Sequence, residues 1–123
     1  MKRNFYIDAE NTQQEWLKIL PHLNGNDTVH LFTSAAVSYA AEPPAITKCK
    51  IIKHHCNGGH RNAMDFLIVG LLGYLAHKYP ARQHIVISKD LGFDTAASII
   101  PNDNVVRMSP HSFIEKVSVG AKV

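Results

Sequence analysis

Features that would point to a secreted or membrane protein are scarce in this sequence of 123 residues. Its two cysteines, Cys49 and Cys56, are too few for a disulfide framework and favour a reducing compartment. The longest apolar stretch, residues 66–76, contains two glycines and is too short to span a bilayer. The N-terminal residues run directly into an apolar segment, so we expect no signal peptide. These observations predict a cytoplasmic protein that has no membrane partner.

Charge of either sign is also modest. Thirteen Lys and Arg against ten Asp and Glu give a net charge of +3, to which eight histidines can add in mild acid. This balance permits a polyanionic partner without requiring one. We find no internal repeat, linker or low-complexity segment, and the length suits one sizeable core. We therefore expect a single domain over residues 1–123.

Short apolar segments alternate with helical patterns along the chain. We expect strands at residues 5–7, 29–32, 49–53, 85–87 and 104–108. We expect helices from residue 12 to about 20, at 35–41, at 61–79, after Gly92, and from 109 to about 117. This alternation predicts an α/β fold, a three-layer α/β/α sandwich around a central five-stranded, mostly parallel sheet.

Three details of these elements follow from local patterns. Thr12 and Glu15 form the capping-box pattern that opens a helix. The third strand is the least apolar, so we expect it at the sheet edge, with residues 54–59 forming a loop after it. The long helix is apolar on nearly every side, which predicts that it is largely buried.

Aspartates lie where the expected strands end. Asp8 follows the first strand, Asp90 and Asp94 follow the fourth, and Asp65 interrupts the apolar start of the long helix. Parallel strands place their carboxyl ends on one edge of the sheet, where ligands bind in open α/β folds. Clustered carboxylates with few basic partners repel one another unless a cation lies among them, and oxygen ligands favour Mg²⁺ or Mn²⁺.

Four sequence pieces carry a family resemblance: residues 6–11 (YIDAEN), 58–66 (GGHRNAMDF), 86–90 (VISKD) and 92–94 (GFD). In this order they make the chain resemble a PIN-like domain, close to the NYN branch. Those families are metal-dependent ribonucleases with a three-layer α/β/α fold. The resemblance covers almost the whole chain, from its first strand to about residue 117.

The resemblance implies a function and a set of site residues. The expected activity is Mg²⁺- or Mn²⁺-dependent hydrolysis of phosphodiester bonds, with single-stranded RNA as the expected substrate. The implied catalytic and metal-binding residues are Asp8, Asp65, Asp90 and Asp94. The expected substrate-binding residues are Asn11, Ser34, Arg61, Asn62, Ser88 and Lys89. The short chain suggests a homodimer, or a partner protein that helps to form the substrate groove.

Other interpretations of the same residues stay open. Asp90 and Asp94 are also typical of a turn and a helix cap, Asn62 of an N-cap, and Lys89 of an ion pair with a neighbouring Asp. The three histidines and the thiol within residues 54–60 can ligate zinc, although no Cys-x-x-Cys or His-x-x-x-His spacing accompanies them. The chain can also be a non-catalytic nucleic-acid-binding or interaction module, including one half of a toxin–antitoxin-like pair.

Two further metal-site classes fit the sequence poorly. A phosphoacceptor receiver domain requires an aspartate after its third strand, where this chain has His54 and His55. A haloacid-type phosphatase requires Asp-x-Asp after its first strand, whereas this chain has Asp8-Ala9-Glu10.

Overall fold

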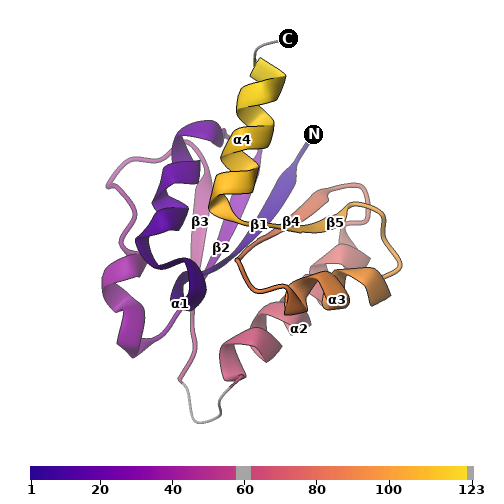
Figure 1. Cartoon of the computed structure of the whole chain (residues 1–123), viewed down its shortest axis with the longest axis horizontal. Helices are drawn as coiled ribbons and strands as arrows, with labels where there is room; N and C mark the ends of the chain where they lie inside the picture. The colour runs from indigo at the N-terminus through magenta and orange to yellow at the C-terminus, as the bar shows by residue number, and fades with distance from the viewer. Residues whose placement is uncertain (58–61, 122–123) are drawn as a thin grey trace.

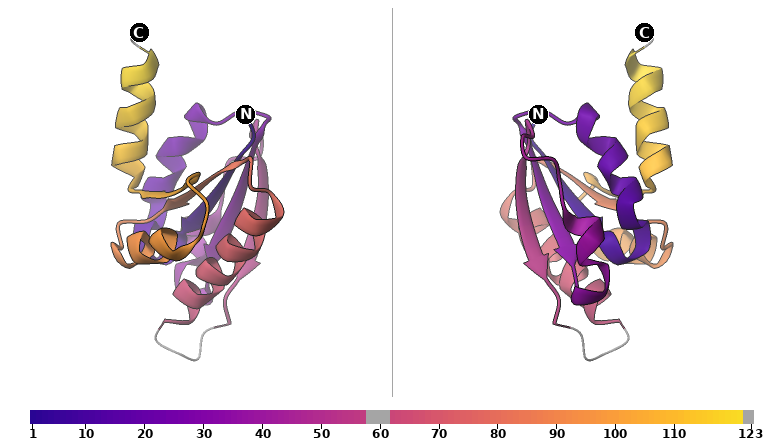
Figure 2. Two further views of the ribbon diagram at one scale, coloured as in Figure 1. Left: turned by 90° about the vertical axis from the view of Figure 1, so that its right-hand side faces the viewer. Right: turned by 90° about the vertical axis from the view of Figure 1, so that its left-hand side faces the viewer.

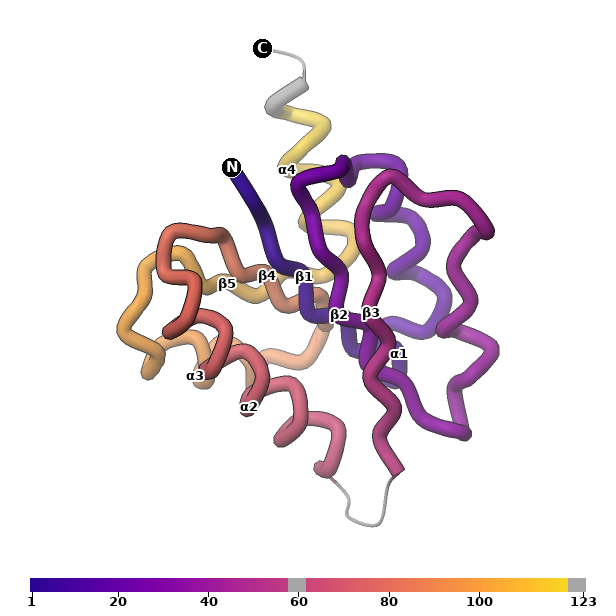
Figure 3. Tube along the Cα trace, turned by 180° about the vertical axis from the view of Figure 1, so that it is seen from behind, coloured from indigo at the N-terminus to yellow at the C-terminus, as the bar shows by residue number. Residues whose placement is uncertain are grey.

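The computed structural model describes residues 1–57 and 62–121, which form a five-stranded sheet covered by helices (Figure 1). The strands are β1 (Arg3–Asp8), β2 (Asp27–Thr33), β3 (Lys50–His55), β4 (Gln83–Ile87) and β5 (Val105–Met108). Their spatial order is β3-β2-β1-β4-β5, and every neighbouring pair is parallel (Figure 3). The expected α/β fold class and the edge position of the third strand are therefore confirmed.

Helices cover both faces of the sheet. They are α1 (Ala9–Thr12), the 3₁₀ helices η1 (Gln13–His22) and η2 (Ala35–Ala41), α2 (Ala63–Lys78), α3 (Gly92–Ile99) and α4 (Pro110–Ala121). Figure 2 shows α2 on one face of the sheet and η1 with α4 on the other. Across the described ranges, no helix combines the length and the apolar character needed to cross a membrane.

Alternation along the strands divides the core between the two faces. Phe5 and Ile7 of β1 join the cluster that contains Trp16 of η1 and Phe113 of α4. Tyr6 lies between them in sequence and joins the opposite cluster under α2 and α3. Successive strand side chains point to opposite faces, so the apolar strand residues bury both sides of the sheet.

The helix after β1 begins earlier than the capping-box pattern predicts. Asp8 caps α1 at Ala9, so Thr12 is already its fourth residue, and the Thr12 hydroxyl donates to the Asp8 carbonyl oxygen at 2.9 Å. Thr12 makes no side-chain capping bond to η1. Gln13 then has φ 51°, in the left-handed region, which ends α1 and starts the 3₁₀ helix. The prediction that a helix opens after Thr12 is confirmed by η1, but the capping-box bond that it assumed is absent.

Two expectations about the middle of the chain also need correction. His54 and His55 belong to β3 and not to a loop, because the strand continues its pairing with β2 through Thr33. The long helix is not largely buried. It buries Met64, Ile68, Leu72 and Ala76, which share one face, while the side chains of its other faces are partly or well exposed.

Candidate active site

The candidate site lies outside the carboxyl ends of β1 and β4. The chain passes from β1 to β2 and β3 on one side, and from β4 to β5 on the other. The neighbouring strands β1 and β4 therefore mark the point where the direction of winding reverses, and ligands of open α/β sheets bind in the crevice at such a point. Asp8 ends β1, and Asp90 lies three residues beyond the end of β4.

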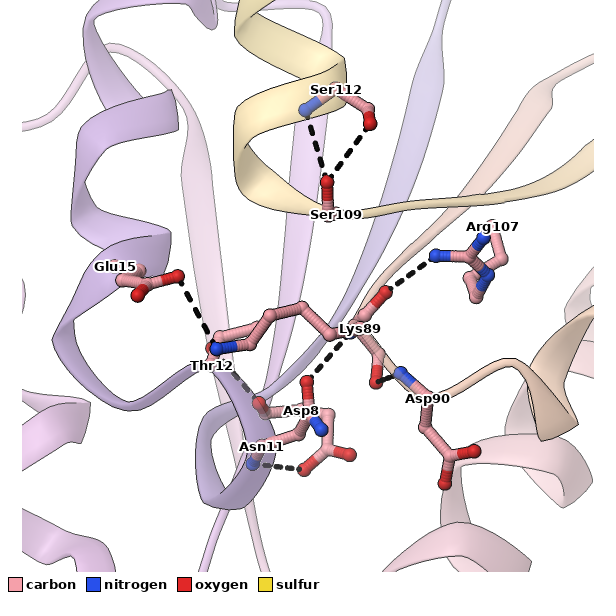
Figure 4. A network of polar contacts seen from close by, with 10 residues as sticks. Asp8, Asn11, Thr12, Glu15, Lys89, Asp90, Arg107, Ser109 and Ser112 are labelled. Carbon is pink, nitrogen blue, oxygen red and sulfur yellow. Dashed lines mark hydrogen bonds and ion pairs between the residues drawn. The ribbon is translucent and has the colours of Figure 1, made fainter.

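Asn11 joins the two strand ends. Its backbone N–H donates to Asp8 Oδ1 at 3.2 Å, which satisfies a free amide at the start of α1. Its side-chain oxygen accepts a bond from the Lys89 backbone N–H at 2.6 Å (Figure 4). Asn11 thus fixes the position of the Asp8 carboxylate relative to the turn that carries Asp90.

The turn after β4 is organised by its own side chains. Ser88 is fully buried, and its hydroxyl accepts the Asp90 N–H at 3.1 Å. Asp90 Oδ1 in turn accepts the Gly92 N–H at 2.9 Å. A Cβ at residue 92 would lie 3.1 Å from this same oxygen, so glycine leaves space for the carboxylate. The turn interpretation of Asp90 is confirmed, and the turn holds its carboxylate at the edge of the sheet.

Carboxylates from separate segments influence one another at this edge. Burial, together with the smaller effects of the Asp65 and Glu10 charges, raises the pKa of Asp8 to about 6, against the hydrogen bond from Asn11. Burial also raises the pKa of Asp65, with added contributions from Asp90 and Glu10. Like charges that act on each other in this way lie in one electrostatic neighbourhood. Asp8 and Asp90 each act on Asp65, and we call these three residues, with Glu10, the acidic neighbourhood.

Glu10 is a member of this neighbourhood that sequence reasoning missed. We interpreted it only as part of a loop and helix start, but its carboxylate acts on both Asp8 and Asp65. The Ser34 hydroxyl, from the end of β2, donates to Glu10 Oε2 at 3.4 Å. The signal in the sequence was its position two residues after Asp8, in the first turn of a helix that starts at the sheet edge.

Asp94 and Lys89 have other partners. Asp94 Oδ1 lies 2.8 Å from Nε of Arg107 on β5, and the Arg107 guanidinium also donates to the Ser88 carbonyl at 2.9 Å. Lys89 Nζ lies 3.6 Å from Oε2 of Glu15, so its ion-pair interpretation is confirmed with a glutamate in place of an aspartate.

Asn62 and Arg61 are the remaining expected residues. Asn62 occupies the N-cap position, but its side chain makes no capping hydrogen bond. The exposed Asn62 side chain therefore does not cap the helix. Arg61 lies outside the described residues, as does His60 of the zinc interpretation. Of the other histidines in that cluster, His54 has its Nε2 2.9 Å from Nδ1 of His30.

Within residues 1–57 and 62–121, no group of three or more His, Cys, Asp or Glu side chains is arranged to hold a metal ion. The donor chemistry nevertheless fits a hard divalent cation. Carboxylate and hydroxyl oxygens are the ligands that Mg²⁺ and Mn²⁺ prefer. Burial is the largest cause of the raised pKa of Asp8, and repulsion from Asp65 and Glu10 adds to it. A cation beside these groups would offset both effects.

Fold and site together define a class, the three-layer α/β proteins that gather carboxylates where the sheet reverses its winding. Comparison with known families gives the narrower assignment. The family model PIN7, described as a PIN domain, matches residues 2–104. The chain therefore belongs to the PIN domain family, whose members are generally nucleases and typically use divalent metals. Searches of curated proteins and of solved structures found no significant match.

Proposed function

We propose that this protein is a Mg²⁺- or Mn²⁺-dependent nuclease that hydrolyses phosphodiester bonds in single-stranded RNA. The observation that carries the proposal is that Asn11 links Asp8 of β1 to the β4–α3 turn that carries Asp90, with the Asp65 carboxylate of α2 acting on both acids. The PIN domain match supports nuclease chemistry, and the resemblance to the NYN branch favours RNA. A cytoplasmic setting agrees with the free thiols of Cys49 and Cys56.

The acids have distinct roles in this proposal. Asp8, Asp65 and Asp90 hold the cation, and Glu10 adds negative charge beside them. The cation, when bound, supplies an activated water and neutralises charge that develops on the phosphate. Asp94 acts indirectly, because its partner Arg107 also holds the Ser88 carbonyl at the base of the turn.

The polar residues position these acids or bind substrate. Asn11 sets the spacing between the ends of β1 and β4, and Ser34 orients Glu10. Ser88 is buried and shapes the turn from within. Lys89, Arg61 and Asn62 are the proposed contacts to substrate phosphates, and Lys89 would exchange its ion pair with Glu15 for a phosphate.

A second candidate function is a non-catalytic nucleic-acid-binding module that retains the fold and the acids. One observation favours it: the described parts of the chain contain no three-donor group already arranged for a metal ion. A nuclease must therefore draw its carboxylates closer when a cation binds, whereas a binding module has no such requirement.

A cleavage assay separates these functions. Labelled single-stranded RNA and DNA of one sequence are incubated with the protein in Mn²⁺, in Mg²⁺ and in EDTA. We expect metal-dependent cleavage of RNA that falls by about 100-fold or more in an Asp8→Asn, Asp90→Asn double variant. Asp103→Asn, at an exposed aspartate outside the acidic neighbourhood, is the matched control and should cleave as wild type does.

Two results would count against the nuclease. Cleavage that persists in the double variant would place the activity elsewhere. Binding of RNA without cleavage in either metal would support the non-catalytic module. Preferential cleavage of the DNA strand would support the nuclease but show that its substrate is DNA.

A further inference from the structure

The long helix α2 carries aromatic side chains that its core packing does not use. Phe66 is 73% exposed and Tyr74 is 59% exposed, and Gly70 lies midway between them. Residues four apart on a helix share a face, so these three form one line, which we call the aromatic stripe. The core contacts of α2 come from a different line of residues, which includes Ile68 and Leu72. The stripe residues therefore do not take part in packing α2 against the sheet.

The centre of the stripe is hollow. A cavity of about 360 Å³ lies over Gly70 and is lined by Phe32, His54, Phe66, Leu67, Gly70, Leu71 and Tyr74. A Cβ at Gly70 would meet no atom within 4 Å, so packing does not require glycine there. At 1.5 Å per residue, the Cα atoms of Phe66 and Tyr74 are about 12 Å apart, which leaves open space between the rings.

The far wall of the hollow adds an aromatic surface from β3. The His54 ring stacks on Phe32 with their centroids 4.8 Å apart, and also on His30 at 5.1 Å. Burial lowers the pKa of His54, which favours the neutral ring at neutral pH. A flat, uncharged group that enters the hollow would meet aromatic faces or edges from both α2 and β3.

The two ends of the stripe differ in charge. At the start of α2, Phe66 directly follows Asp65 of the acidic neighbourhood. At the other end, Lys78 Nζ lies 5.7 Å from the centre of the Tyr74 ring and 5.5 Å from that of Tyr79. The Arg82 guanidinium lies 3.8 Å from the Tyr79 ring. The stripe thus leads from the proposed cleavage site to a pair of cations.

We infer that the aromatic stripe is a base-stacking subsite for single-stranded nucleic acid leading away from the acidic neighbourhood. This inference rests on the proposed nuclease function and adds Phe66 and Tyr74 as substrate-binding residues. Bases stack on exposed aromatic rings while the backbone follows cations, which is the usual pattern of single-strand binding. Lys78 then contacts a phosphate beyond the second ring. A duplex is excluded from this mode because its bases are already stacked and paired.

Alanine variants test the stripe without cleavage. Binding of a labelled single-stranded RNA is measured by fluorescence anisotropy at low salt in EDTA, with the same sequence as a duplex for comparison. We expect Phe66→Ala and Tyr74→Ala each to weaken single-strand binding about five-fold or more, and to leave duplex binding unchanged. Phe66→Trp, which keeps a stacking surface, should bind as wild type does.

Tyr39→Ala is the matched control. Tyr39 is 54% exposed, close to the value for Tyr74, but it lies on η2, which packs on the opposite face of the sheet. Its removal should leave binding unchanged. The three side chains replaced in these four variants are exposed, so melting curves should remain close to that of wild type.

Two results would overturn the inference. One is single-strand binding that is unmeasurable in wild type or unchanged in both stripe variants. The other is a change of oligomeric state in sedimentation, with RNA binding unchanged, which would identify the stripe as a contact between copies. The nuclease proposal is judged separately. If the wild type cleaves RNA and the stripe variants bind RNA as wild type does, only the nuclease proposal stands. If binding depends on the stripe but no cleavage occurs, only the subsite stands.

Discussion

At the residue scale, Asp8 is the group whose environment departs most from that of a free carboxyl. It is 4% exposed, and its pKa is about 6 against an ordinary value of 3.8. A raised pKa means that the folded protein holds the proton more tightly than the unfolded chain does. The stabilisation from the protonated form is therefore complete below pH 3.8 and is lost as the pH rises through about 6.

We expect Asp8→Asn to stabilise the fold at neutral pH when no divalent cation is present. A pKa difference of this size corresponds to about 1–3 kcal/mol in the free energy of unfolding above pH 6. Melting temperatures in EDTA between pH 4 and 8 should show an advantage for the variant that shrinks toward pH 4. An advantage that grows in acid, or equal stability at pH 7.5, would contradict this account of Asp8. Asp103→Asn controls for loss of one negative charge.

Some residues of the candidate site could be proposed from the sequence and others could not, for different reasons. Asp8, Asp65 and Asp90 could be predicted because strand ends and helix starts are visible in the apolar pattern. Glu10 could not, because the pattern does not show where a side chain on a first helical turn points. The Arg107 partner of Asp94 could not be predicted either, because their contact depends on how α3 packs beside β5.

At the scale of elements, α2 has two apolar faces, one packed in the core and one at the surface. Leu72 is fully buried in the core under the sheet, while Leu67 is 40% exposed at the edge of the hollow. Composition alone does not separate them, because a helix that is apolar on most sides resembles a buried one. The difference arises because the sheet covers only one face of α2.

The matched pair Leu72→Ala and Leu67→Ala tests this division. Removing a buried leucine leaves a cavity and should lower the free energy of unfolding by about 2–5 kcal/mol. The same change at Leu67 should cost less than about 1 kcal/mol. Urea denaturation of both variants provides the comparison. Similar losses for the two would show that both faces of α2 are packed equally.

The elements were predicted best where the chain forms strands. The five segments predicted as strands correspond to β1–β5, since short runs of apolar, β-branched residues are typical of buried strands. The first two helices were expected as ordinary ones, but η1 contains Pro21 and η2 has a non-helical residue at Val37, with φ −127° and ψ 27°. These interruptions favour short 3₁₀ turns, and local propensity alone did not reveal them.

At the scale of the whole molecule, strand order is what assembles the site. Because β1 lies in the centre of the sheet beside β4, segments separated by about two thirds of the chain meet at one edge. The helix α2, which joins β3 to β4, brings Asp65 to the same edge from the other direction. The central claim is that these three carboxylates form a single divalent-cation site.

The measurement that tests this claim most directly is the effect of Mn²⁺ on melting temperature. Wild type is compared with Asp8→Asn, Asp65→Asn and Asp90→Asn, and Asp94→Asn and Asp103→Asn serve as controls. A ligand at 100 times its Kd stabilises the fold by about 2.7 kcal/mol, which is a shift of several degrees. We predict that Mn²⁺ raises the melting temperature of wild type, that EDTA reverses the rise, and that each of the first three variants loses most of it. Both controls should keep most of the rise. An equal rise in all six proteins, or none in wild type, would contradict a shared cation site.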